Sequence, residues 1–443
     1  MQTLSLCLAG AIAVAGLCWL AGDVSAETIA LEMKKVDLSV TPTPGDSPLI
    51  AAGRLTRAQS FSIQMGSPET RVVQPRTKGN KAFSAAVTQE PEYKSDTPFK
   101  GVALLGSEKY AFAFDSSGKD VETSQSVMLS DMALAFDRLY FDLNCNGDLT
   151  DDGVIEAETA RATSPLYVIC TFPATEMKVE CDGDMIDYAF TMSVYTNVDS
   201  RTEGRTEVQY AYAKASLSAA VYRQGEITLD GEKQPIVLVD RNSNGRFDDY
   251  ASVHISHTIH MGSTPFRQRG DMLFVNPQAD ASKAPLHLMN LMNIENVYYD
   301  VEVTPSGDQL TIDSSDLAIG YIASDTPDYR ADIYGDLGFL TIQADETGKA
   351  AIPEGEWRFM SYSVQAEEAS DDESVKPRVW RISIRGPSDG NTTTIVGGET
   401  KDLSFGAPFK PVVTASPSVD GMTVSLGLSV VGVGGGERAL GFP

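Results

Sequence analysis

The chain has 443 residues and a formal net charge of −26, with 61 acidic residues against 35 basic ones. This length predicts roughly three domains, each long enough to bury a core. Because no stripe of lysine and arginine occurs, the sequence excludes nucleic-acid binding, whereas the acidic balance suits divalent cations.

Residues 1–26 predict a signal peptide. An apolar run from Leu4 to Trp19 precedes the small-x-small sequence Val24-Ser25-Ala26, which is typical of a cleavage site. No lysine or arginine precedes the run, and the run is long enough for an uncleaved anchor, so an anchor is the alternative. After cleavage we expect no membrane span and a secreted, periplasmic or cell-surface location.

Short apolar runs, rich in aromatic and β-branched residues and separated by glycine and proline, predict an all-β, multidomain protein. Residues 27–94 predict N-terminal strands and loops. Tyr110-Ala-Phe-Ala113 recurs as Tyr210-Ala-Tyr-Ala213, and each copy precedes a similar polar loop by about thirty residues, which predicts a duplicated β module. The modules span 95–204 and 205–310, and a β-sandwich-like C-terminal region spans 311–443.

The two polar loops share the pattern D-x-N-x-N-G-x-Φ-x-D, in which Φ is an apolar residue. Alternate residues of such a loop turn oxygen atoms inward, as a Ca²⁺ ion with six to eight oxygen ligands requires. The candidate ligands of the first loop are Asp142, Asn144, Asn146, Asp148, Asp151 and Asp152. Those of the second loop are Asp240, Asn242, Asn244, Arg246, Asp248 and Asp249. Asp148 and Arg246 would contribute main-chain carbonyl groups.

Glycine and an apolar residue complete each loop. Gly147 and Gly245 permit the sharp turn at position 6, and Leu149 and Phe247 are expected to fix position 8 to the apolar core. A predicted strand leads directly into each loop, over residues 139–141 and 235–239. The sequence therefore predicts two strand-launched calcium sites.

These loops resemble the calcium loops of EF-hand and dockerin proteins, which begin D-x-[DN]-x-[DN]-G. They differ at position 12, where Gly153 and Ala251 replace the bidentate glutamate, and no helix pattern follows. We therefore expect weak affinity, on the order of 10⁻⁴ to 10⁻³ M. The first loop should bind more tightly, because arginines occur in the second. In broad texture the chain resembles β-rich secreted bacterial proteins that carry such loops.

Residues 340–359 contain a strand, the turn Asp345-Glu-Thr-Gly-Lys349 and the strand Ile352-Pro-Glu-Gly-Glu-Trp357. This succession resembles the small β-sandwiches of transthyretin and of carboxypeptidase-regulatory domains. The resemblance implies a structural or interaction module without catalytic residues.

Three cysteines follow the predicted signal. Cys170 and Cys181 flank a strand-turn-strand pattern, so either a disulfide in an oxidising compartment or two packed thiols would fit, and both interpretations stay open. Cys145 occupies a non-ligating position of the first loop and is interpreted as incidental.

Three further patterns favour ordinary structure over chemistry. The histidines at 254, 257 and 260 lie on an alternating strand pattern, which separates them too widely for one zinc ion. Gly386-Pro-Ser-Asp-Gly390 matches a nucleophile motif, but a β-turn is favoured because strand residues follow and no histidine occurs after His287. The acidic run Glu367–Glu373 predicts a solvated loop.

Together these patterns predict an exported calcium-binding protein with a structural or interaction role at the cell envelope or outside the cell. Its partners would be calcium and a cell-surface or extracellular protein or glycan. The alternative is a secreted hydrolase or carbohydrate-active protein in which calcium only braces the scaffold. A deep cleft lined by two carboxylates would favour that alternative; the sequence itself leans against an enzyme.

Overall fold

The protein is described by a computed structural model, which places fifteen segments of the chain. They are residues 26–37, 56–65, 79–118, 122–123, 134–164, 166–203, 206–229, 231–258, 262–277, 285–368, 378–385, 392–404, 410–417, 424–431 and 438–439. The predicted signal residues before Ala26 and the Gly386–Gly390 pattern lie outside this description. Within it the chain is built from β-strands with one short helix, α2 (Gly79–Ala86), so the all-β prediction is confirmed.

Two sheets contain most of the strands in the first half of the chain. The four-stranded antiparallel sheet has the order β4 (Phe99–Leu105), β5 (Glu108–Asp115), β7 (Arg138–Phe141), β8 (Val154–Glu156). The seven-stranded sheet has the order β3 (Gln59–Met65), β13 (Thr206–Ala219), β12 (Asp184–Glu203), β10 (Tyr167–Thr171), β9 (Thr159–Ser164), β6 (Glu122–Thr123), and β11 (Thr175–Cys181) also pairs with β12.

Two further sheets follow, and strands from the N-terminus form an edge of each. The five-stranded sheet has the order β19 (Leu286–His287), β18 (Met272–Val275), β15 (Glu232–Val239), β14 (Val221–Leu229), β2 (Glu32–Lys35). The four-stranded sheet has the order β1 (Glu27–Ala30), β22 (Gln309–Ser314), β21 (Val297–Val303), β20 (Leu291–Ile294). The hairpin β16 (Ser252–Thr258) with β17 (Gly262–Gln268) stands between β15 and β18 in the chain.

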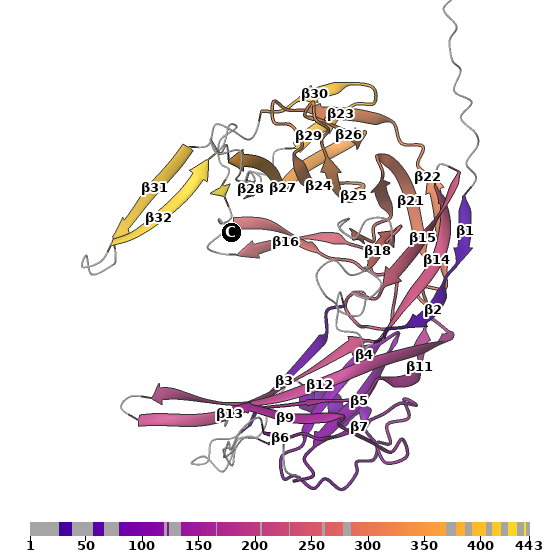
Figure 1. Ribbon diagram of the computed structural model, residues 1–443, viewed down its shortest axis with the longest axis vertical. Helices are drawn as coiled ribbons and strands as arrows, with labels where there is room; N and C mark the ends of the chain where they lie inside the picture. The colour runs from indigo at the N-terminus through magenta and orange to yellow at the C-terminus, as the bar shows by residue number, and fades with distance from the viewer. Residues whose placement is uncertain are drawn as a thin grey trace, which may run out of the picture.

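The C-terminal part contains its own pair of sheets. One has the order β26 (Lys349–Pro353), β23 (Ile319–Ala323), β30 (Thr400–Asp402), with β30 parallel to β23. The other has the order β25 (Gly338–Gln343), β24 (Arg330–Gly335), β27 (Gly355–Glu368), β28 (Arg378–Arg385), β33 (Arg438–Ala439), and β29 (Thr392–Ile395) pairs with β27. The last hairpin is β31 (Lys410–Pro417) with β32 (Val424–Val431). Figure 1 shows the hairpins that contain β13, β16 and β31 extending toward one side.

Two main clusters of buried side chains hold these sheets together. The larger cluster joins the sheets of the first three-quarters of the chain and is rich in aromatic rings such as Phe112, Phe141 and Phe190. The rings of Phe141 and Phe190 lie 4.6 Å apart between centroids, which fixes the strand before the first loop against the seven-stranded sheet. The second cluster lies between the C-terminal sheets around Trp357 and Ile352.

The two Tyr-Ala-aromatic-Ala segments do not occupy equivalent strands. Tyr110 lies on β5, which pairs directly with β7 and so with the strand that leads into the first loop. Tyr210 lies on β13, whereas the strand that leads into the second loop, β15, pairs with β14 and β18. A feature that recurs before both loops is a strand that pairs antiparallel on both sides and then enters the loop.

Candidate metal centres

The first candidate site begins where β7 ends. Asp142 is buried, and its carboxylate accepts hydrogen bonds from the backbone N–H groups of Asn146 and Gly147, both at 3.0 Å. Gly147 has a φ of +81°, a conformation that a side chain disfavours. The loop is therefore wound tightly around the first aspartate.

The two asparagines of this loop meet the aspartate at its tenth position. The side-chain amides of Asn144 and Asn146 donate to Oδ2 of Asp151, at 3.3 and 2.8 Å. Their oxygens face the backbone, since Asn144 Oδ1 accepts from the Asn146 N–H at 3.1 Å and Asn146 Oδ1 from the Asp148 N–H at 2.7 Å. One carboxylate at position 10 thus gathers both asparagines.

The second loop repeats this network residue by residue after β15. Asp240 accepts from the N–H groups of Asn244 (3.2 Å) and Gly245 (2.8 Å). The amides of Asn242 and Asn244 donate to Oδ2 of Asp249, at 2.7 and 2.8 Å. The shared sequence pattern therefore encodes one local structure twice.

Backbone conformation and anchoring also match between the loops. Position 4 is left-handed in both, with φ +58° at Cys145 and +59° at Ser243, and Gly245 repeats the positive φ of Gly147. Leu149 and Phe247 are both fully buried, as the sequence predicted for position 8. The Cys145 side chain contacts the Lys109 carbonyl through its Sγ at 3.8 Å, and the Cys145 backbone interacts with Asp142.

A further carboxylate closes each loop, and in the second it comes from a residue that the sequence reasoning missed. In the first loop Asp152 accepts from the N–H of Leu143, at position 2, at 3.0 Å. In the second, Asp271 accepts from the N–H of Arg241, also position 2, at 2.9 Å, and from the Asp249 N–H at 3.0 Å. Asp271 directly precedes β18, where the register pairs Val239 with Met272 and so brings Asp271 beside Asp240.

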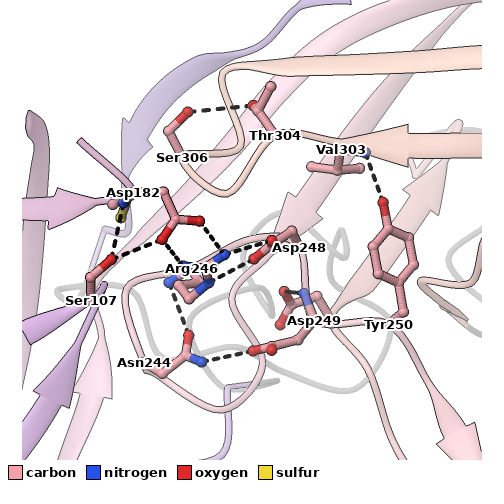
Figure 2. A network of polar contacts seen from close by, with 12 residues as sticks. Ser107, Asp182, Asn244, Arg246, Asp248, Asp249, Tyr250, Val303, Thr304 and Ser306 are labelled. Atoms are coloured by element: carbon pink, nitrogen blue, oxygen red, sulfur yellow. Dashed lines mark hydrogen bonds and ion pairs between the residues drawn. The ribbon is translucent and has the colours of Figure 1, made fainter. Parts of the chain in front are cut away.

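The remaining predicted ligands have side chains that bind elsewhere. Asp148 accepts from the N–H and hydroxyl of Thr150, at 2.8 and 2.6 Å. Arg246 forms ion pairs with Asp248 at 2.8 Å and with Asp182 at 2.9 Å, as Figure 2 shows. The sequence predicted that Asp148 and Arg246 bind a metal ion through their main-chain carbonyl groups alone. The side-chain contacts of these two residues do not occupy those carbonyl groups.

The second loop is also a junction between distant parts of the chain. The Gly106 N–H, in the turn between β4 and β5, donates to the Asn244 carbonyl at 2.6 Å, and the Tyr188 hydroxyl donates to Asp240 at 2.8 Å. On the other side, the Val303 N–H donates to the Tyr250 hydroxyl at 2.9 Å (Figure 2). Three other sheets therefore contact the loop that leaves the five-stranded sheet.

Burial gives the carboxylates of both loops an unusual electrostatic setting. Asp240 and Asp271 are both fully buried and close to each other, and burial raises the pKa of both, that of Asp240 to about 7. Burial likewise raises the pKa of Asp142 and Asp152, with neighbouring carboxylates adding to the effect. The arginines nearby form their ion pairs with other carboxylates, namely Asp182, Asp248 and Asp332.

The donor set of each loop fits a hard cation. Carboxylate, amide and carbonyl oxygens are the ligands that Ca²⁺ takes, and an oxygen that accepts one N–H retains a second lone pair. Among the described residues, no group of three or more histidine, cysteine, aspartate or glutamate side chains is arranged to hold a metal ion without the help of other groups. A site here thus depends on asparagine and backbone oxygens as well.

The other patterns of the sequence have structural explanations where the chain is described. Cys170 and Cys181 are buried free thiols, so of the two open interpretations the structure shows packing. They lie on β10 and β11, which pair with different stretches of β12. His254 lies on the predicted strand, and its Nε2 contacts Gln268 at 2.7 Å.

A groove of about 630 Å³ bears on the hydrolase alternative. It runs along β1, β2 and β14, and its charged lining residues are Glu27, Glu32, Lys34, Glu226 and Lys233. The Lys34 ammonium donates to Glu32 at 2.6 Å and lowers the pKa of that carboxyl. An ionised, exposed Glu32 could match only the ionised carboxylate of a glycoside hydrolase pair and not its protonated acid.

Comparison with known proteins adds no relative from which a role could be transferred. No family model, no curated protein and no solved structure matches this chain. Within the part of the chain that the structure describes, no helix has the length and apolar character needed to cross a membrane.

Proposed function

We propose that this protein is an exported calcium-binding β protein whose two loops, at Asp142 and Asp240, each bind one Ca²⁺ that braces the scaffold. Its role is to support structure or to bind a partner, at the cell envelope or outside the cell. Export is supported by the apolar N-terminal segment with its small-x-small end, and the acidic balance of the chain suits a calcium-rich compartment.

The repeated network carries this proposal. Two loops far apart in the chain hold a buried aspartate at position 1, amides at positions 3 and 5, and a carboxylate at position 10 in the same arrangement. The buried pair Asp240 and Asp271 strengthens it, because buried charges in proteins are paired or coordinate a metal. A cation bound in the loop would add positive charge directly at these carboxylates and offset the cost of burying them.

The asparagine side chains indicate what calcium has to displace. In both loops two amide N–H groups contact the position-10 carboxylate, and those contacts end when that carboxylate binds a cation. Breaking them opposes binding, and the neutral asparagines add no charge. Both effects favour the weak affinity expected from the sequence.

Calorimetric titration of the full chain with CaCl₂, and thermal melting in calcium against chelator, test the proposal. We expect two binding events and a higher melting temperature in calcium, since an ion that binds only the folded state stabilises it by mass action. Asp345→Asn is the control, because Asp345 makes a similar turn with Thr347 but lies in the C-terminal sandwich. An unchanged melting temperature together with the absence of binding heat would exclude calcium as a structural element.

A further inference from the structure

Three arginines gather beside the second loop, although the chain as a whole carries a net charge of −26. Arg241 is position 2 of the loop, Arg267 lies on β17, and Arg269 lies between β17 and β18. Each interacts electrostatically with at least one of the other two, and all three act on the imidazole of His287. Arg57 and Arg330 lie at the margin of this arginine cluster and add to its positive charge.

Arg267 is the most buried member, and its positive charge is poorly compensated. Its side chain is 19% exposed, and its guanidinium lies over the ring of Phe339, 4.4 Å from the centroid. Its contact with Asp332 is long, at 3.8 Å, and Asp332 already accepts from the Thr341 hydroxyl at 2.8 Å. Nε of Arg267 is buried and has no hydrogen-bond partner among the residues that the structure describes.

The backbone holds the arginine cluster in place. The Arg57 N–H donates to the Arg241 carbonyl, and the Arg241 N–H donates to Asp271. Between Arg269 and Asp271, Gly270 packs so closely that an added Cβ would lie 2.4 Å from the Asp249 carbonyl oxygen. His287 Nδ1 contacts the Gly270 carbonyl at 3.2 Å. The positions of the arginine backbones are thus fixed by the loop and by β18.

Holding like charges together costs free energy unless an opposite charge joins them. The cost is visible in the pKa of Arg267, which burial and the neighbouring arginines lower to about 10. Burial and the same arginines lower the pKa of His287 to about 4, so this histidine is neutral at pH 7 and adds no charge. An anion at the cluster would remove the repulsion.

We propose that Arg241, Arg267 and Arg269 form a binding site for a sulfate or phosphate group. Guanidinium groups suit such oxyanions because their planar N–H donors form parallel hydrogen bonds with two oxygens. Arg267 provides a buried, preorganised donor beside a ring, and Arg269 is exposed and accessible to a ligand from solvent. The site adjoins the second loop, since Arg241 directly follows Asp240 and its charge also acts on Asp271.

Titration of the calcium-free full chain with sodium sulfate, and separately with sodium phosphate, tests the proposal by calorimetry at constant ionic strength. Chelator keeps calcium phosphate from forming and makes the result independent of the calcium proposal. We expect saturable binding of at least one of the two anions, and the tighter one identifies the preferred group. Sodium chloride in their place should give no saturable heat.

Variants decide which residues bind. Arg269→Gln changes an exposed side chain and should weaken anion binding about tenfold. Arg161→Gln, which changes an exposed arginine on β9, should leave the affinity for the anion unchanged. Arg267→Lys retains the charge but loses the planar donor and should also weaken binding, with circular dichroism verifying the fold. The absence of saturable binding to both anions, or an affinity unchanged by Arg269→Gln, would overturn the proposal.

Discussion

Replacing Tyr188 with phenylalanine removes a single hydroxyl from the buried side of the second loop. That hydroxyl donates to Asp240 at 2.8 Å, and both side chains are almost completely buried, so water cannot take its place. A hydrogen bond to a charged group contributes about 1.5–3 kcal/mol to stability. At pH 8, above the pKa of about 7 that burial gives Asp240, the carboxylate is mostly ionised and the full loss is expected.

Tyr250→Phe provides a matched control in the same region. Its hydroxyl accepts from the Val303 N–H at 2.9 Å, which is a neutral pair at a half-buried position. Its loss should cost about 0.5–1.5 kcal/mol.

Urea unfolding in chelator at pH 8, monitored by circular dichroism, measures both variants against the parent protein. Tyr188 lies in the larger core and Tyr250 packs against it, so the two variants are compared by the urea transition in which that core unfolds. If Tyr188→Phe destabilised this transition no more than Tyr250→Phe, the claim that Asp240 is a buried, charged acceptor would be refuted.

Three further predictions concern the loops and their surroundings. Asp142→Ala and Asp240→Ala should each remove one calcium-binding event in calorimetry, with dissociation constants on the order of 10⁻⁴ to 10⁻³ M. Asp142→Ala should remove the tighter of the two sites, and equal losses of affinity in the two variants would contradict this ranking. Gly147→Ala should destabilise the protein more than Gly153→Ala in thermal melting. Both positions have a positive φ, which costs a side chain about 1–2 kcal/mol, but among the described residues only the Cβ at position 147 would meet a neighbour, Ala86 O at 2.8 Å. Burial and the arginine cluster lower the pKa of His287 to about 4 from the ordinary 6.5, so the unfolded chain binds more protons and stability should fall as pH drops from 6.5 toward 4. His287→Gln should reduce that fall in the melting temperature, and an identical pH profile would contradict the assignment.

Local patterns predicted the strands and the loops well because their causes are local. Short continuous apolar runs specified β5 and β15, and Pro305-Ser-Gly-Asp308 specified the hairpin of β21 and β22. The D-x-N-x-N-G pattern specified both loop networks, since each hydrogen bond joins residues a few positions apart. Side-chain chemistry over ten residues was enough for these features.

Features that depend on sheet pairing were beyond the sequence. Asp271 is brought to Asp240 by the register of β18 against β15, and no pattern near Asp271 indicates that partner. The same limit explains the Tyr210 segment, whose likeness to Tyr110 is a local resemblance between strands of different sheets. Strand partners depend on which apolar faces pack together, and that is decided by the whole core.

The hairpin of β16 and β17 separates Asp249 from Asp271, whereas Asp151 and Asp152 are neighbours in the first loop. Closing a longer stretch of chain costs more entropy and slows the contacts that depend on it. The first loop can therefore close as soon as β7 and β8 have paired, while the second must wait until the hairpin has folded and β18 has joined its sheet. Refolding should complete the two loops in that order, and the junction of sheets around the second loop should be one of the last parts of the molecule to form.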